Sequence, residues 1–253
     1  MKRIVPLLLM LLLAFSLSAC GNSNENAESP GSTLSDESMQ TSSPSEPPAS
    51  ANASGEESTA SQPTEESGSN ILIAYFSRVG NTDFEEGVDA VASASLNLEG
   101  DTLVGNAEVL ARMAQEETGG DLFQIETVEK YPSDYDETTD VAAEEQDRDA
   151  RPELASHVEN MDQYDTVILI YPNWWSTLPQ PLFTFLEEYD FSGKTILPLC
   201  THAGSRMGRS EQDIAGLCPD ATLLEGLAVS GSSVNEASAD VAEWITNSGI
   251  LEE

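Results

Sequence analysis

Three short segments of the sequence contain residue types that could bind a flat, negatively charged ligand. Residues 77–82 combine two hydroxyls, an amide, a glycine and an arginine. Residues 172–179 contain the adjacent residues Trp174 and Trp175, and residues 200–205 contain a thiol, a histidine and a glycine. Each segment follows a short apolar run, so we expect each to lie at the end of a strand.

The first segment has the composition of a phosphate-binding turn. Gly80 lets the backbone approach a ligand closely, and backbone N–H groups with a following helix N-terminus attract an anion. Ser77, Asn81 and Thr82 add short polar side chains, and Arg78 adds a positive charge. The segment has no Gly-Lys-Ser/Thr and no G-x-G-x-x-G, which excludes the P-loop and the dinucleotide-binding fingerprint.

The tryptophan pair favours a planar ligand. Two consecutive indoles cannot both point inward from an extended segment, so we expect one of them to face solvent or a flat ring. We expect Trp174 to be the stacking residue, because it lies closer to the turn that begins at Pro172, and Trp175 to be packed as a core residue. The alternative is that the rings pack in the core.

The cysteines, the other histidine and the acidic residues give weaker evidence for a functional site. Cys200 and His202 lack an evident orienting carboxylate, so covalent catalysis is not expected. A disulfide between Cys200 and Cys218 is the alternative to two buried thiols. We expect the thiols, because the predicted sheet separates the two residues by more than the bridging limit of about 7 Å between Cα atoms. His157 is predicted to be a surface residue. The acids of residues 134–149 lack the spacing of a calcium loop, which favours a solvated helix face and no metal site.

Strands and helices alternate along the chain. Apolar runs predict strands at residues 71–76, 122–125, 166–171, 195–199 and 222–224, and helical spacing predicts helices at 107–118, 135–150, 180–189, 211–217 and 236–247. We expect Asn106 to cap the first of these helices, Gly119 and Gly120 to end it, and Pro198 to lie at a strand end. Such alternation specifies an α/β protein with a parallel sheet covered on both faces. Ligands bind such sheets beyond the carboxyl ends of the strands.

These segments resemble those of the flavodoxins. Residues 74–82, Ala-Tyr-Phe-Ser-Arg-Val-Gly-Asn-Thr, resemble the flavodoxin phosphate loop, which typically reads Ser/Thr-x-Thr-Gly-Asn-Thr. Residues 171–175 and 200–205 are similar to the two flavin-ring loops of a flavodoxin-like family that includes exported bacterial members. The resemblance covers about residues 70–248. It implies a three-layer sandwich with five parallel strands in the order 2-1-3-4-5 and FMN at the sheet edge.

The resemblance also implies which residues hold FMN, and it implies no catalytic residue. The implied residues are Ser77, Arg78, Gly80, Asn81, Thr82, Pro172, Asn173, Trp174, Trp175, Thr201, His202, Gly204 and Ser205. The sequence departs from the family pattern in three places. Val79 replaces the usual Thr, and residues 83–105 are inserted before the first helix as a candidate lid. The third loop has no aromatic residue, so we expect one face of the flavin to be open or covered by a partner.

Composition excludes other classes of protein. The 253 residues include 45 acidic and 10 basic residues, which gives a formal net charge of −35. A nucleic acid would meet no basic stripe on such a chain. Three cysteines are too few for a disulfide-stapled scaffold.

The N-terminus resembles an export and lipidation signal. Lys2 and Arg3 precede an apolar stretch at residues 4–15 that is too short to span a bilayer comfortably. Residues 17–21, Leu-Ser-Ala-Cys-Gly, resemble the lipobox of bacterial lipoproteins. We therefore expect removal of residues 1–19, lipidation of Cys20, and anchoring outside the cytoplasmic membrane. The alternative is an ordinary signal peptide with a chance cysteine.

The remaining chain divides into a tether and one domain. Residues 20–69 are predicted to be a disordered tether, because residues 22–69 contain nine acidic residues and no basic or aromatic residue. Residues 70–253 are long enough for one domain and contain eight basic and 36 acidic residues.

Three functions fit these observations. The first is an extracytoplasmic FMN protein that transfers electrons to a partner protein or a small-molecule acceptor. The second is an NAD(P)H- or quinone-linked FMN oxidoreductase of the same fold, and the third is a binding lipoprotein without flavin. The sequence favours the first and does not decide whether the protein is an enzyme.

Overall fold

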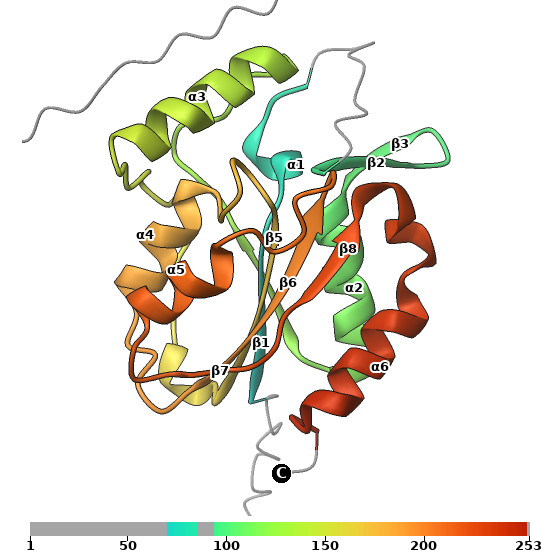
Figure 1. Cartoon of the computed structure of the whole chain (residues 1–253), viewed down its shortest axis with the longest axis vertical. Coiled ribbons are helices and arrows are strands. Elements are labelled where there is room, and N and C mark those ends of the chain that lie inside the picture. The colour runs from blue at the N-terminus through green and yellow to red at the C-terminus, as the bar shows by residue number, and fades with distance from the viewer. Residues whose placement is uncertain (1–69, 85–93, 252–253) are drawn as a thin grey trace, which may run out of the picture. The chain divides into compact units, whose positions relative to one another are not determined.

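The computed structural model describes residues 70–84 and 94–251 (Figure 1). The predicted signal peptide, Cys20 and the predicted tether lie outside these residues, so the expectations about them stay predictions. Within the part of the chain that is described, no helix has the length and apolar character needed to cross a membrane.

A parallel sheet forms the middle layer of the domain. Its strands are β1 (Ile71–Phe76), β4 (Asp121–Ile125), β5 (Thr166–Pro172), β6 (Thr195–His202), β7 (Thr222–Leu223) and β8 (Leu227–Ser230). The order is β4-β1-β5-β6-β7, and β8 also pairs with β6. Numbered by the five predicted strands, this is the expected order 2-1-3-4-5. The predicted fold class is confirmed, and β8 is a strand that the sequence patterns missed.

Helices cover both faces of this sheet, as Figure 1 shows. One face carries α3 (Tyr135–Asp147), α4 (Gln180–Glu188) and α5 (Ser210–Leu217), and the other carries α2 (Asn106–Thr118) and α6 (Ser238–Ser248). Consecutive residues of β5 enter different cores: Ile168 packs with α2 and α6, whereas Leu169 packs on the opposite side. This burial on both faces explains why β1 and β5 are continuous apolar runs. Two 3-10 helices, η1 (Met161–Gln163) and η2 (Gly231–Glu236), complete the elements of the layers.

Pro198 lies inside β6, so its expected position at a strand end was wrong. On one side, β6 pairs with β7 through Ile196 and with β8 from Leu199 onward. Ile196 O accepts from Leu224 N, and Pro198, two residues later, has its missing N–H on that same side. The proline therefore falls where one neighbouring strand has ended and the next has not begun, and it removes no ladder bond.

The described part of the insertion forms a hairpin. Strands β2 (Leu96–Glu99) and β3 (Thr102–Gly105) pair in antiparallel fashion. Helix α2 follows at once, with Gly105 at its N-cap position and no side-chain cap, so the expected capping by Asn106 was wrong. Gly119 ends α2 in the left-handed conformation with φ 67°, as expected.

The hairpin returns the chain to the first loop. Short helix α1 (Arg78–Asn81) follows β1, and Gly105 lies so close to it that a Cβ there would be 1.8 Å from Ser77 Oγ. The start of α2 therefore lies beside residues 77–82 in spite of the insertion.

Substituting Gly105 tests this close approach. Gly105→Ala should lower the free energy of unfolding by about 1–3 kcal/mol, because Ser77 is buried and must shift. Gly216→Ala is the matched control, since a Cβ there meets nothing within 4 Å. It should raise stability by about 0.5–1 kcal/mol, as alanine favours a helix. Denaturant unfolding of both variants measures the difference, and equal stabilisation in both would contradict the close packing.

Candidate functional site

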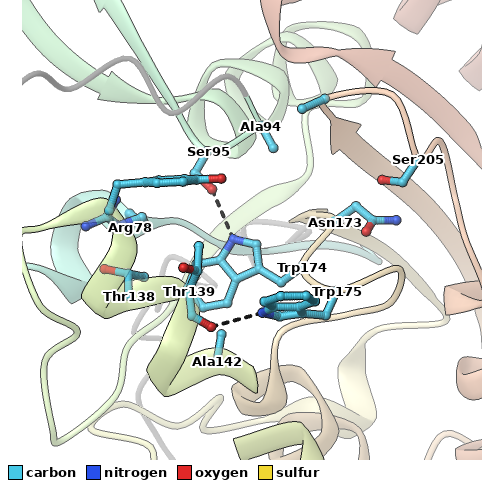
Figure 2. A pocket seen from close by; sticks show the side chains of 12 residues that line it. Arg78, Ala94, Ser95, Thr138, Thr139, Ala142, Asn173, Trp174, Trp175 and Ser205 are labelled. Atoms are coloured by element: carbon cyan, nitrogen blue, oxygen red, sulfur yellow. Dashed lines mark hydrogen bonds between the residues drawn. The ribbon is translucent and has the colours of Figure 1, made fainter. Parts of the chain in front are cut away.

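A pocket of about 410 Å³ lies at the carboxyl ends of β1, β5 and β6. Its described lining consists of Arg78, Ala94, Ser95, Tyr135, Thr138, Thr139, Ala142, Asn173, Trp174, Trp175, Ala203 and Ser205 (Figure 2). These residues come from the first loop, the part of the insertion just before the hairpin, α3 and the loops after β5 and β6. The expected convergence of three loops is therefore present, and α3 and the insertion add two further walls.

The pocket differs in charge from the rest of the domain. Arg78 is the one charged residue among the described residues that line it, and none of those residues is acidic. The domain as a whole has 36 acidic and eight basic residues. The negative charge of the domain would repel an anion from most of its surface. The pocket is therefore the place where an anionic ligand meets the weakest repulsion.

Asn81 serves the structure of the first loop. Its side chain is fully buried, and Nδ2 donates to Ser77 O and to Ile125 O, each at 2.9 Å. Its Oδ1 accepts from Thr127 N at 2.7 Å and from Thr127 Oγ1 at 3.0 Å. All the polar capacity of this amide is therefore used within the protein, and Asn81 positions the turn.

Two other polar atoms of this loop are buried without a hydrogen-bond partner among the described residues: Arg78 Nε and Thr82 Oγ1. A buried polar group without a partner costs free energy, so such atoms indicate where a polar ligand would bind. Burial lowers the pKa of Arg78, and Asp134 partly opposes this effect. The loop thus keeps a cation and a hydroxyl available, as a phosphate site needs.

Gly80 permits the tight path of this loop. Its φ is 94°, in the left-handed region, and a Cβ there would lie 2.0 Å from Gln124 Nε2. That same Nε2 donates to Val79 O at 2.6 Å, and Lys130 Nζ donates to Gly80 O. Glycine is therefore required by the backbone conformation and by the neighbouring side chain.

The two tryptophans have different surroundings. Trp174 is half-buried, and its ring meets Phe76 and Tyr131 edge-on, with centroids 5.4 and 5.2 Å apart. Its Nε1 donates to Ser95 Oγ at 3.0 Å (Figure 2). Trp175 is 55% exposed and donates from Nε1 to Thr139 O at 3.0 Å. One ring is packed and the other is largely exposed, as the adjacency of the pair predicted. The packed ring is Trp174, so the expected packing of Trp175 was wrong. The stacking role of Trp174 stays a prediction.

The third loop is held by one hydrogen bond within it and one to the insertion. His202 Nδ1 accepts from Gly204 N at 2.9 Å, and Thr201 Oγ1 donates to Ala94 O at 2.6 Å. Burial lowers the pKa of His202, and Arg206 adds to this effect. Burial raises the pKa of the Cys200 thiol to about 12, so the pair offers neither a thiolate nor a free Nδ1.

The structure brings five of the predicted residues to the pocket: Arg78, Asn173, Trp174, Trp175 and Ser205. The other predicted residues do not line it: Ser77, Gly80, Asn81, Thr82, Pro172, Thr201, His202 and Gly204. Among them, Asn81, Thr201 and His202 make the hydrogen bonds described above and so shape the loops around the pocket.

Sequence reasoning missed the α3 wall of the pocket. Residues 135, 138, 139 and 142 follow the i, i+3, i+4, i+7 spacing of one helical face, and that face is uncharged in an otherwise acidic helix. This uncharged face was the feature of the sequence from which the wall could have been predicted.

Two expectations outside the pocket are confirmed. Cys200 and Cys218 are both free and buried. His157 is exposed, and its Nδ1 lies 2.5 Å from Glu188 Oε1. Among the residues that the structure describes, no cluster of His, Cys, Asp or Glu suits a metal ion.

The fold and the site define an α/β protein with a pocket, lined in part by aromatic side chains, at the carboxyl edge of a parallel sheet. A family model described as Flavodoxin matches residues 100–248. This chain belongs to the flavodoxin family.

Three solved structures are similar to this chain. A candidate flavoprotein from Bacteroides uniformis is 25% identical, with a TM-score of 0.53 over 71% of this chain and 99% of that one. A candidate flavoprotein from Bacteroides eggerthii is 27% identical, with a TM-score of 0.49 over 69% and 98%. A Lactobacillus acidophilus flavoprotein in complex with FMN is 17% identical, with a TM-score of 0.47 over 66% and 97%. No curated protein matches the chain.

The tryptophans should respond unequally to truncation. Trp174→Ala should lower the melting temperature clearly, because its half-buried ring packs against Phe76 and Tyr131. Truncating a fully buried aromatic costs about 3–5 kcal/mol, and we expect a smaller loss of the same sign here. Trp175→Ala should change the melting temperature little, since its ring is 55% exposed. Thermal melts of both variants without added ligand measure this, and equal shifts would contradict the assigned surroundings.

Proposed function

We propose that this protein is an FMN-binding flavoprotein that transfers electrons outside the cytoplasmic membrane. The observation that carries the proposal is the pocket at the sheet edge. It combines two indole rings with one arginine, and its described lining has no carboxylate. A flat ring that carries a phosphate matches that combination, and membership in the flavodoxin family supports FMN as the cofactor.

The residues present fit the two parts of FMN. Two buried atoms without partners would be donors for a phosphate: Arg78 Nε, whose residue lines the pocket, and Thr82 Oγ1, in the loop beside it. Trp174 and Trp175 offer aromatic surface for the ring system. FMN, when bound, supplies the electron-transfer chemistry, and the protein sets its orientation and surroundings.

The neighbouring polar groups favour a carrier of electrons over covalent catalysis. The Cys200 thiol is buried with a raised pKa, and His202 Nδ1 is engaged by Gly204 N. Neither group is available as a nucleophile or base. The electron acceptor would be a protein or a small molecule that reaches the pocket.

Adding FMN to the purified protein tests the proposal directly. We expect saturable quenching of flavin fluorescence, and chemically reduced, FMN-loaded protein should pass electrons to an added one-electron acceptor. Protein that stays colourless and leaves FMN fluorescence unchanged would contradict the proposal and favour a flavin-free binding function. Rapid oxidation of NADPH with added quinone would instead favour the oxidoreductase.

We expect the Thr82 hydroxyl to donate a hydrogen bond to the phosphate of FMN. Thr82→Ala removes a hydroxyl that has no partner within the described residues, and a hydrogen bond to a charged group is worth about 1.5–3 kcal/mol. We expect the variant to bind FMN roughly tenfold more weakly and riboflavin about as well as before. Fluorescence titration with both flavins measures this. Thr222→Ala, at an exposed position of β7, is the control. An equal loss for both flavins would show that this loop does not contact the phosphate.

Cys20 should anchor the protein. The sequence around Cys20 resembles a lipobox, and diacylated proteins are held stably at a membrane. Cys20→Ser should therefore release the protein from the membrane fraction or leave the signal uncleaved. Fractionation of cells that express each form measures this, and normal processing with membrane retention would overturn the lipoprotein proposal.

A further inference from the structure

Helix α3 presents an uncharged face to the pocket. Tyr135, Thr138, Thr139 and Ala142 line the pocket from successive turns of this helix. The acidic residues of α3 occupy its other positions and do not line the pocket: Asp136, Glu137, Asp140, Glu144, Glu145 and Asp147. The helix is thus divided into an acidic surface and a neutral wall.

Tyr135 is the large side chain of this wall. It is 56% exposed although it lies at the first turn of α3 and lines the same pocket as the two tryptophans. An aromatic ring held open at a pocket with two indoles is available for a planar ligand. The loop after β6, where the sequence offered no aromatic residue, contributes only Ala203 and Ser205 to the lining.

The backbone that leads into Tyr135 is fixed by the first loop. Arg78 Nη2 donates to Pro132 O at 2.7 Å and to Ser133 O at 3.1 Å. Thr138 Oγ1 also donates to Pro132 O, at 2.9 Å. The first loop, residues 77–82, would hold the phosphate. Through Arg78 it also fixes the backbone that positions Tyr135.

The other end of the wall is joined to the tryptophan loop. Trp175 Nε1 donates to Thr139 O at 3.0 Å (Figure 2). Gln146 Nε2 donates to Trp175 O at 3.5 Å. The start of α3 is thus linked to the first loop and its later turns to the second. The wall is built into the site and is not a free surface helix.

We propose that Tyr135 is a third ring-binding residue of this site, contributed by α3, and that it contacts the flavin ring system directly. The assignment rests on the proposed function, because it takes FMN as the ligand. Tyr135 is assigned to the ring system of the flavin, so its contribution to binding should not depend on the phosphate.

Three variants test the assignment: Tyr135→Ala, Tyr135→Phe and Asp136→Ala. Each is titrated with FMN and with riboflavin, and flavin fluorescence is followed. Tyr135→Ala should weaken the binding of both flavins by a similar factor, roughly three- to tenfold, and should leave the bound flavin less quenched. Tyr135→Phe should bind within about twofold of the wild type. Asp136→Ala, a neighbouring exposed residue outside the pocket, should bind as the wild type does.

The outcomes separate this assignment from the proposed function. If the wild type binds flavin and Tyr135→Ala binds both flavins equally well, the assignment is wrong and the proposed function stands. Loss in Tyr135→Phe as large as in Tyr135→Ala would overturn the ring contact in favour of the hydroxyl. If the wild type binds neither flavin, the proposed function fails and the assignment fails with it. A thermal melt of each variant checks folding, and a large fall for Tyr135→Ala would give the ring a structural role and overturn the assignment.

Discussion

The buried amide of Asn81 is the constraint on which the site depends. Its hydrogen bonds to Ser77 O, Ile125 O and Thr127 join the turn after β1 to the segment after β4. The backbone of Asn81 continues the link, because its carbonyl accepts from Tyr131 N at 2.8 Å. Buried polar networks of this kind specify one arrangement, since every unmade bond is costly. The turn, the following segment and the start of α3 are therefore fixed together.

The distribution of charge gives this arrangement its selectivity. The domain has few cations, and Arg78 places one of them at the pocket while it also holds the segment before α3. The acids of α3 lie on the surface beside a neutral wall. Exposed charges are screened beyond about 8 Å at physiological salt, so the nearest groups determine what the pocket attracts.

The insertion completes the site. Ser95 accepts from Trp174 Nε1, Ala94 accepts from Thr201 Oγ1, and both residues line the pocket. The hairpin that follows returns the chain to Ser77. The close approach is possible because Gly105 has no Cβ, which would overlap Ser77 Oγ. A departure from the family pattern therefore supplies a wall of the pocket and keeps the helix start beside the first loop.

The sequence alone predicted five strands of the sheet and the loops at its carboxyl edge, because apolar runs buried on both faces and residues 77–82 carry strong local signals. The order of the strands followed from the resemblance to the flavodoxins. The sequence also indicated that the tryptophans would differ. Only the tertiary structure decided that Asn81 turns inward, that Pro198 fits between β7 and β8, and that Tyr135 belongs to the pocket. These outcomes depend on contacts between residues far apart in the chain, which local periodicity does not encode.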